Sequence, residues 1–292
     1  MVRGFANACV LTGLAVLLAG CGEAEDTTPP VASMQVSLSR PKVALGSPVE
    51  VTYKFTVAPN APALGQRRVF VHFLDADDEL MWTDDHDPPT PTVEWKAGQT
   101  IEYTRSMFVP SYPYVGAAKI VSGLYTPGSN ERLKLSNEDR GDRSYKVVDF
   151  ELLPQTENIF VIFKDGWHPA EVVSDGAGRT EWQWTKKEST IAFRNPKRDV
   201  VLVLQADNPA AAANTASQVT VQIGDQVLTT VPLSAEQAPV LKYPITAAQL
   251  GTGDMVEMKF TADRTFVPAL EPAMKSADPR ELGARFFHIF IQ

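Results

Sequence analysis

The sequence predicts an all-β protein that folds into two tandem antiparallel β-sandwiches. Apolar residues recur at every second position in many short runs, which is the spacing of strands with one buried face. The 22 prolines among the 292 residues are spread along the chain and argue against long helices. Clusters of glycine, proline and asparagine separate the runs, as the turns between short strands require.

The first group of runs lies within residues 33–153. From Val49 to Val57 apolar and polar residues alternate strictly, which predicts a strand with one solvent-facing side. Residues 68–74 are apolar at nearly every position, as in a central strand that is covered on both sides. Further strands are expected at 101–107, 117–125 and 144–153. Short strands in this number, with turn signals between them, match an immunoglobulin-like sandwich.

The second group of runs lies within residues 157–292. Gly224-Asp225 separates two alternating segments and predicts a two-residue hairpin turn. Strands are expected at 159–163, 182–184, 191–193, 200–204, 219–223, 226–230, 256–260 and 286–291. A jelly-roll is the arrangement that we expect for these strands. Helical turns are expected at 235–238 and 246–250.

Residues 1–20 have the features of a secretory signal peptide. Arg3 precedes an apolar run that is too short to span a bilayer but fits the central region of such a signal. The run ends in Leu18-Ala19-Gly20-Cys21, which resembles the lipobox of bacterial lipoproteins. The resemblance implies cleavage before Cys21 and acylation of this cysteine, including palmitate-type chains. Lipid chains contribute about 0.8 kcal/mol per buried methylene, so a multiply acylated cysteine would anchor the protein durably to a membrane.

Residues 21–32 are polar and contain two prolines, which predicts a flexible tether between the lipid and the first sandwich. Gly22 follows Cys21 where an aspartate would favour retention in the inner membrane, so the outer membrane is expected, with the protein facing the periplasm or the cell surface. The alternative is an ordinary signal peptide with a chance cysteine. Cys9 lies inside the signal, so the mature chain is expected to have no disulfide bond.

Two series of motifs resemble accessory domains of bacterial membrane glycosyltransferases. In the first sandwich the motifs are VFVHFLD (69–75), DDHDPPTPT (84–92), WKAG (95–98) and GLY (123–125). Their order is similar to that in extracytoplasmic β-sandwich domains of these enzymes. In the second sandwich the motifs are GWHPAE (166–171), WQW (182–184), FVP (266–268) and DPRELG (278–283). These resemble the jelly-roll, carbohydrate-binding-like domain found beside glycosyltransferases in surface-polysaccharide systems. The resemblance implies an architecture and a setting among envelope glycans, and it implies no activity.

The most acidic segment is residues 75–87, which contains six aspartates. Oxygen-rich loops can hold calcium, so a structural calcium ion is the one cofactor that we consider. Its candidate ligands are Asp75, Asp77, Asp84, Asp85 and Asp87. The alternative is a hairpin with a turn at 75–78, a return strand at 79–83 and a solvated loop at 84–89. No other metal is expected.

Tryptophans of the second sandwich are the best candidates for a binding function, because indole rings stack on the apolar faces of sugars. The candidate glycan-binding residues are Trp167, Glu171, Arg179, Trp182, Gln183 and Trp184. Trp167 follows a glycine in a predicted loop and is the candidate for an exposed platform. Trp182 and Trp184 lie on one face of a strand, which also fits a pair packed between the two sheets.

No catalytic motif is evident. The sequence has no serine in a GxSxG turn, and the mature chain would have no free cysteine to act as a nucleophile. The formal charge of −8 disfavours a nucleic-acid partner. We therefore expect a non-catalytic envelope lipoprotein that binds glycan or acts as a scaffold in surface-polysaccharide or envelope assembly. The alternatives are a lipoprotein that docks other envelope proteins and, more remotely, a weak hydrolase with two facing carboxylates.

Overall fold

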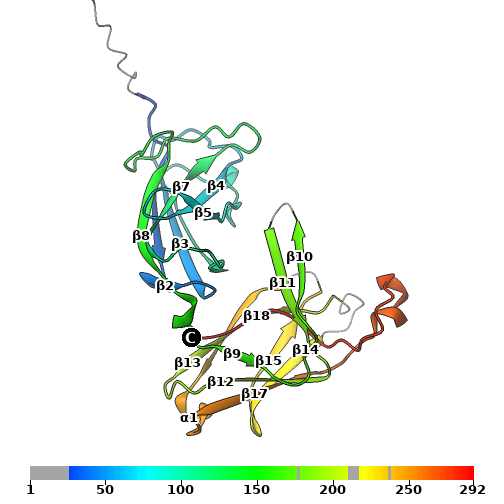
Figure 1. Cartoon of the computed structure of the whole chain (residues 1–292). Helices are drawn as coiled ribbons and strands as arrows, with labels where there is room; N and C mark the ends of the chain where they lie inside the picture. The colour runs from blue at the N-terminus through cyan, green and yellow to red at the C-terminus, as the bar shows by residue number, and fades with distance from the viewer. Residues whose placement is uncertain (1–25, 176–177, 210–216, 236–237) are drawn as a thin grey trace, which may run out of the picture.

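The computed structural model describes residues 26–175, 178–209, 217–235 and 238–292. Its strands form four sheets (Figure 1). All paired strands run antiparallel except β2 (Lys42–Ala44) and β8 (Tyr145–Leu153), which are parallel. The predicted all-β fold of antiparallel sandwiches is confirmed. Within these described ranges, no helix has the length and apolar character needed to cross a membrane.

The first sandwich pairs a three-stranded sheet with a five-stranded sheet. The smaller sheet has the order β1 (Ala32–Leu38), β3 (Pro48–Val57), β6 (Thr100–Phe108). The larger sheet has the order β2, β8, β7 (Gly116–Tyr125), β4 (Arg68–Leu74), β5 (Leu80–Thr83). The alternating residues of β3 enter the core as predicted, since Val51, Tyr53 and Phe55 are fully buried. A short 3-10 helix, η1 (Thr92–Glu94), precedes β6.

The second sandwich has two five-stranded sheets. One has the order β10 (Glu171–Asp175), β11 (Gly178–Trp184), β18 (Arg285–Ile291), β13 (Val200–Asp207), β16 (Val240–Ile245). The other has the order β15 (Gln226–Leu233), β14 (Ser217–Ile223), β17 (Met255–Ala262), β12 (Glu188–Arg194), β9 (Val161–Phe163). We number the eight strands from β11 to β18 as one to eight. Strands one, eight, three and six (β11, β18, β13, β16) are neighbours in one sheet, and strands two, seven, four and five (β12, β17, β14, β15) are neighbours in the other. This is the order of a jelly-roll, as predicted.

Few helical turns interrupt the second sandwich. Helix α1 (Ala247–Leu250) lies where a turn was predicted, and the Thr246 and Gln249 side chains form a capping box at its start. The 3-10 helices η2 (Gln155–Glu157), η4 (Pro268–Leu270) and η5 (Pro272–Met274) lie outside the sheets. The helical turn predicted at 235–238 includes residues 236 and 237, which lie outside the described residues.

The chain is fastened to the first sandwich from Asp26 onward. The Asp26 carboxylate accepts a hydrogen bond from Arg143 Nη2 at 3.1 Å, and the backbone N–H of Val31 donates to the Lys134 carbonyl at 2.9 Å. The predicted tether over residues 21–32 therefore ends earlier than predicted, since Val31 and Ala32 already belong to the first sandwich. The polar composition of residues 26–31 suggested a segment without contacts. Their partners, Arg143 and Lys134, lie more than 100 residues away in the sequence and could not be recognised from it. Residues 1–25, with the predicted signal peptide and Cys21, lie outside the described residues.

The two sandwiches contact each other through three separate elements. The Phe108 ring at the end of β6 stacks on His288 of β18, with ring centroids 3.8 Å apart. Lys242 of β16 pairs with Glu50 of β3 at 2.5 Å. Asn158 Nδ2, just after η2, donates to the Leu45 carbonyl at 2.8 Å. The first sandwich thus lies against the outer face of the sheet that contains β18.

Candidate functional site

Trp167 packs against the core of the second sandwich. Its ring meets Phe163, Phe260 and Phe286 edge-on, with centroids 4.8, 5.9 and 5.5 Å away. Its Nε1 donates a hydrogen bond to the Thr190 carbonyl at 2.9 Å. The prediction of an exposed platform at Trp167 is therefore wrong. The chain turns at Gly166, which has a φ of +84°, and this turn directs the indole toward the core instead of into solvent.

Trp182 and Trp184 share one face of β11, but this face lies outside the inter-sheet core. Gln183 lies opposite Phe286, which is a core residue, and Trp184 lies opposite Arg285. Because side chains alternate along a strand, the two indoles point to the outer face of the sheet. Their packing between the sheets, which the sequence also allowed, is thus excluded. Trp184 is 6% exposed because Phe266 covers it, with centroids 5.7 Å apart, whereas Trp182 is half-buried.

An arginine lies among the aromatic rings of this outer face. The Arg285 guanidinium lies 5.5 Å from the Trp182 ring, 5.6 Å from the Trp184 ring and 5.0 Å from the Phe287 ring. Its Nε and Nη2 donate to the two carboxylate oxygens of Asp207, both at 2.7 Å. This two-point ion pair fixes the guanidinium plane beside the rings and holds the aromatic side chains in place.

An acidic residue lies directly across from Trp182 on the neighbouring strand. Glu171 of β10 pairs in register with Trp182, so their side chains are neighbours on one face. Arg280 Nη2 donates to Glu171 Oε1 at 2.7 Å and to Asp278 Oδ2 at 2.6 Å. The Arg280 guanidinium lowers the pKa of the Asp278 carboxyl to about 2. Glu171 and Arg280 are each about one-third exposed, so this ion pair can exchange hydrogen bonds with a ligand.

We define the Trp182 face by the residues just described: Glu171, Trp182, Arg280, Arg285 and Phe287. It combines a partly buried indole with a carboxylate acceptor and guanidinium donors, which is the mixture that sugar rings and hydroxyls require. Within the described part of the chain, the buried Nε1 of Trp182 has no hydrogen-bond partner. The face therefore presents an aromatic surface bordered by charged hydrogen-bonding groups.

Gln183 does not join this face, and for Arg179 the structure describes the backbone alone. Gln183 lies on the opposite side of β11, and its Nε2 donates to the His168 carbonyl at 3.2 Å. Arg179 has its backbone opposite Ser174, and its side chain lies outside what the structure describes. Of the six residues proposed from the sequence, the structure thus brings together Glu171, Trp182 and Trp184.

The five calcium candidates are dispersed, and all but Asp77 use their carboxylates within the fold. Asp75 Oδ1 accepts from the backbone N–H groups of Asp77 and Glu79, each at 2.9 Å, which closes the predicted hairpin turn. Asp84 pairs with Arg105, Asp85 accepts from the Val71 N–H, and Asp87 lies 3.4 Å from Arg68 Nε. No group of three or more His, Cys, Asp or Glu in the described ranges is placed to hold a metal ion.

The predicted solvated loop at 84–89 is instead partly buried and holds a polar network. His86 exchanges two backbone hydrogen bonds with Val69, both at 2.9 Å, and its side chain is 5% exposed. Its Nδ1 donates to the Asp84 carbonyl at 2.7 Å, and its Nε2 accepts from the Tyr103 hydroxyl at 2.8 Å. Arg105 donates to both carboxylate oxygens of Asp84 at 2.8 and 2.9 Å. The aspartates suggested a solvent-exposed loop, but His86 pairs with Val69 of β4, and this pairing buries part of the segment.

Stability is expected to decrease as the pH falls below 6.5, in part because of His86. Burial lowers the pKa of His86 below its ordinary value. A group whose pKa is depressed in the folded state costs stability once the unfolded chain can bind the proton, and the full cost is reached below the folded-state pKa. Urea unfolding at pH 7 and at pH 5 should therefore show a larger loss for the native chain than for His86→Gln. If His86→Gln lost as much free energy of unfolding between pH 7 and pH 5 as the native chain, His86 would not be a source of the pH dependence.

Comparisons with known proteins identify no family for this chain. No model of a protein family matches it, and no curated protein matches it. Solved structures with some likeness include the CBM51-2 and INT domains of Clostridium perfringens ZmpB in complex with GlcNAc. That likeness has 11% identity and a TM-score of 0.25, covering 89% of this chain and 40% of the other.

Two further likenesses are equally distant. Bacteroides uniformis beta-glucuronidase has 10% identity and a TM-score of 0.24, over 88% of this chain and 30% of the enzyme. Pseudomonas fluorescens alkylpurine DNA glycosylase AlkC, bound to DNA containing an abasic site analog, has 12% identity and a TM-score of 0.25, over 42% and 30%. This chain thus spans less than half the length of each of these proteins. Similarities this distant do not indicate a function for this chain. A function must be inferred from the side chains of the chain itself.

Proposed function

We propose that this protein is a non-catalytic lipoprotein of the bacterial cell envelope that binds glycan through the Trp182 face. The observation that carries the proposal is the register of β10 and β11, which sets the partly buried indole of Trp182 directly beside Glu171. Arg280 holds this carboxylate from the other side at 2.7 Å. An aromatic ring beside a charged donor and acceptor suits a sugar, whose C–H face stacks while its hydroxyls form hydrogen bonds.

The lipobox-like segment that ends in Cys21 supports the location of this binding module. A lipid anchor on Cys21 would keep both sandwiches at a membrane surface, and Gly22 favours the outer membrane. The motifs shared with accessory domains of glycosyltransferases favour envelope or surface polysaccharide as the ligand. The proposed role is to hold such a glycan during assembly, as a scaffold without chemistry of its own.

Replacing Trp182 with alanine is expected to weaken glycan binding about tenfold or more, because buried aromatic contacts dominate binding energies. The chain from Gly22 to Gln292 would be titrated with envelope polysaccharides and oligosaccharides while tryptophan fluorescence is followed, with and without calcium. Glu171→Gln should weaken binding less, because it keeps one hydrogen-bonding oxygen.

A matched control is Trp82→Phe in the first sandwich. Trp82 is also half-buried and stacks on Phe73, with centroids 4.6 Å apart, but it lies in the other sandwich. This variant should bind glycan as the native chain does. The absence of any saturable change across the panel would overturn the proposal, as would equal affinities for Trp182→Ala and the native chain, provided that both are folded.

A further inference from the structure

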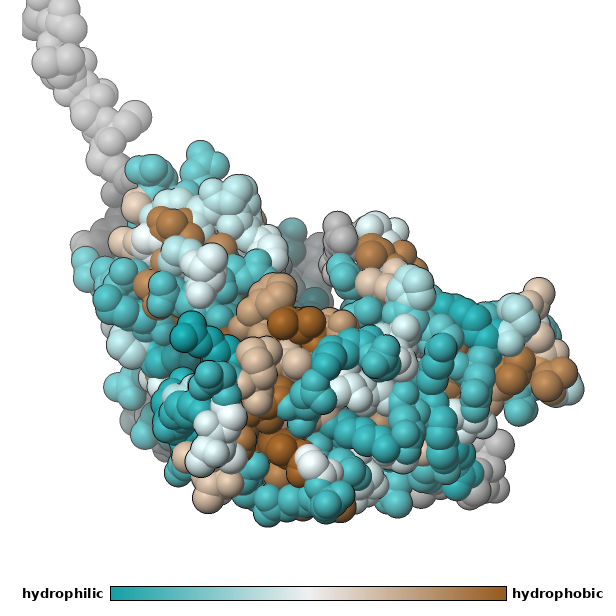
Figure 2. Space-filling model, turned by 60° about the horizontal axis from the view of Figure 1, so that its bottom comes forward, coloured by the Kyte–Doolittle hydropathy of each residue, from teal (hydrophilic) through white to brown (hydrophobic). Residues whose placement is uncertain are grey.

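The surface around β9 is apolar although it is exposed to solvent. Phe160 is 80% exposed, Ile162 45%, Phe163 42% and Met255 49%. Figure 2 shows the molecule from below, with a band of apolar residues between two polar areas. Contiguous exposed apolar surface is unusual for a protein that works alone and marks a binding surface.

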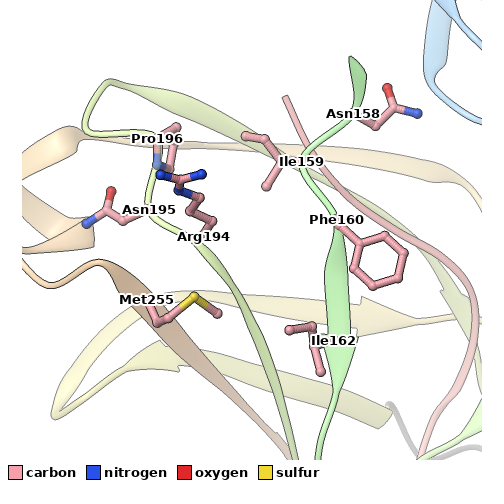
Figure 3. Close-up of a pocket in the computed structure, with 8 residues that line it drawn as sticks. All are labelled: Asn158, Ile159, Phe160, Ile162, Arg194, Asn195, Pro196 and Met255. Atoms are coloured by element: carbon pink, nitrogen blue, oxygen red, sulfur yellow. The ribbon is translucent and has the colours of Figure 1, made fainter. Parts of the chain in front are cut away.

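The apolar residues at this edge border a pocket of about 460 Å³. Its lining includes Ile159, Phe160, Ile162, Arg194, Pro196 and Met255. Figure 3 shows Ile159, Ile162 and Met255 around the Arg194 side chain. The two asparagines of the lining are occupied elsewhere, because Asn158 donates to the Leu45 carbonyl and Asn195 to the carbonyls of the loop at 250–253. The pocket thus offers apolar contacts and one cation.

Strand β9 also has backbone groups beside the pocket that pair with no residue of the described ranges. It is the last strand of its sheet, and it pairs with β12 through Ile162 opposite Ala192. The Lys164 N–H donates to the Thr190 carbonyl, so the backbone groups of alternate residues, Val161 and Phe163, point away from β12. The edge strands β15 and β16 each contain a proline, Pro232 and Pro244, which hinders the addition of another strand. β9 contains none.

Arg194 determines what kind of group would complete this surface. Its side chain is exposed, and it has no hydrogen bond or ion pair with any residue that the structure describes. The neighbouring cations are already paired, Lys164 with Glu257 and Lys197 with Asp254. A partner that buries the apolar pocket must therefore bring a carboxylate to Arg194, since an unpaired buried charge is costly.

We propose that β9 is a docking edge for an extended segment of another envelope protein. The segment adds a strand beside β9, places apolar side chains at alternate positions in the pocket and pairs a carboxylate with Arg194. A second copy of this chain would bring a second Arg194 to the same surface, and its exposed acids nearest to β9, Glu157 and Asp165, lie outside the strand. The charge on this surface therefore favours an acidic segment of a different protein.

The test uses short end-blocked peptides that alternate valine, leucine or phenylalanine with threonine and contain one glutamate at varied positions. Their binding to the chain from Gly22 to Gln292 would be followed by fluorescence anisotropy. At least one glutamate peptide should bind saturably, and its glutamine counterpart should bind about tenfold more weakly, because a charge-assisted hydrogen bond is lost. N-methylation of the amides that face β9 should abolish binding, whereas N-methylation of the alternate amides should not.

Arg194→Glu should reverse the preference, so that the matching lysine peptide binds more tightly than the glutamate peptide. Arg198→Glu is the control, since it makes the same charge change four residues away and should bind as the native chain does. Trp182→Ala should also leave peptide binding unchanged, which separates this proposal from glycan binding. Equal binding of the glutamate and glutamine peptides, or no binding by any peptide, would overturn the proposal. Dimerisation of the chain through this edge would also overturn the proposal. Sedimentation would then show dimers of the native chain and monomers of Ile162→Lys.

Discussion

Replacing Gly166 with alanine should destabilise the second sandwich by about 3 kcal/mol and lower its melting temperature by roughly 10 °C. A Cβ atom at this position would lie 1.9 Å from the Glu188 carbonyl oxygen and 2.6 Å from Ser189 Cα. Both are backbone atoms of β12, so relief requires one strand to move. The φ of +84° adds strain for any residue with a side chain.

The matched control is Gly224→Ala in the hairpin turn between β14 and β15. Gly224 also has a positive φ, +54°, but a Cβ atom there would meet nothing within 4 Å. Its replacement should cost about 1 kcal/mol from backbone strain alone. Thermal unfolding of both variants measures the difference. If the two variants lost equal stability, the close approach of β12 would not be the reason that position 166 requires glycine.

Replacing Cys21 with serine should move the protein almost entirely from the membrane fraction to the soluble fraction. Serine has no thiol to carry the lipid, and each buried methylene of the lipid chains contributes about 0.8 kcal/mol to anchoring. The measurement is fractionation of cells that express the native or variant chain, with mass spectrometry of the N-terminal peptide to identify the lipid.

Cys9→Ser is the control for this experiment. Cys9 lies within the predicted signal peptide, so its replacement should leave membrane attachment and the lipid mass unchanged. Full retention of Cys21→Ser in the membrane fraction, or a native N-terminal peptide without added lipid mass, would contradict the lipoprotein assignment.

The strands that alternate strongly were predictable because each buries one face with large apolar residues. β3 and β17 are examples, and the Gly224-Asp225 turn fixed the hairpin of β14 and β15. β1, β2, β10 and β16 were missed. In β1 apolar and polar residues do alternate from Ala32 to Leu38, so this strand was predictable. Pro244 interrupts the pattern in β16, where pairing with β13 rather than local preference defines the strand.

The candidate site was predictable only in part. The spacing of residues along a strand tells which face of the sheet a side chain lies on, but not which distant residues cover that face. Trp182 and Trp184 share a face as expected, yet Phe266, far along the chain, decides that Trp184 is covered. Trp167 looked exposed because a glycine precedes it, but the turn at this glycine directs the ring to the core. Arg194 carried no sequence signal, since its lack of a partner depends on tertiary contacts.

If the proposed lipid anchor is carried by Cys21, the contact of Asp26 with Arg143 would limit how far the protein can move from the membrane. Asp26 lies five residue steps after Cys21, and an extended chain spans at most about 3.6 Å per step, so this segment could reach about 18 Å at most. With Cys21 held in lipid, the loops around Arg143 would stay close to the head groups. The second sandwich lies at the far end of the first (Figure 1). The Trp182 face and the β9 edge would then be displayed away from the bilayer, where long polymers and other proteins can reach them.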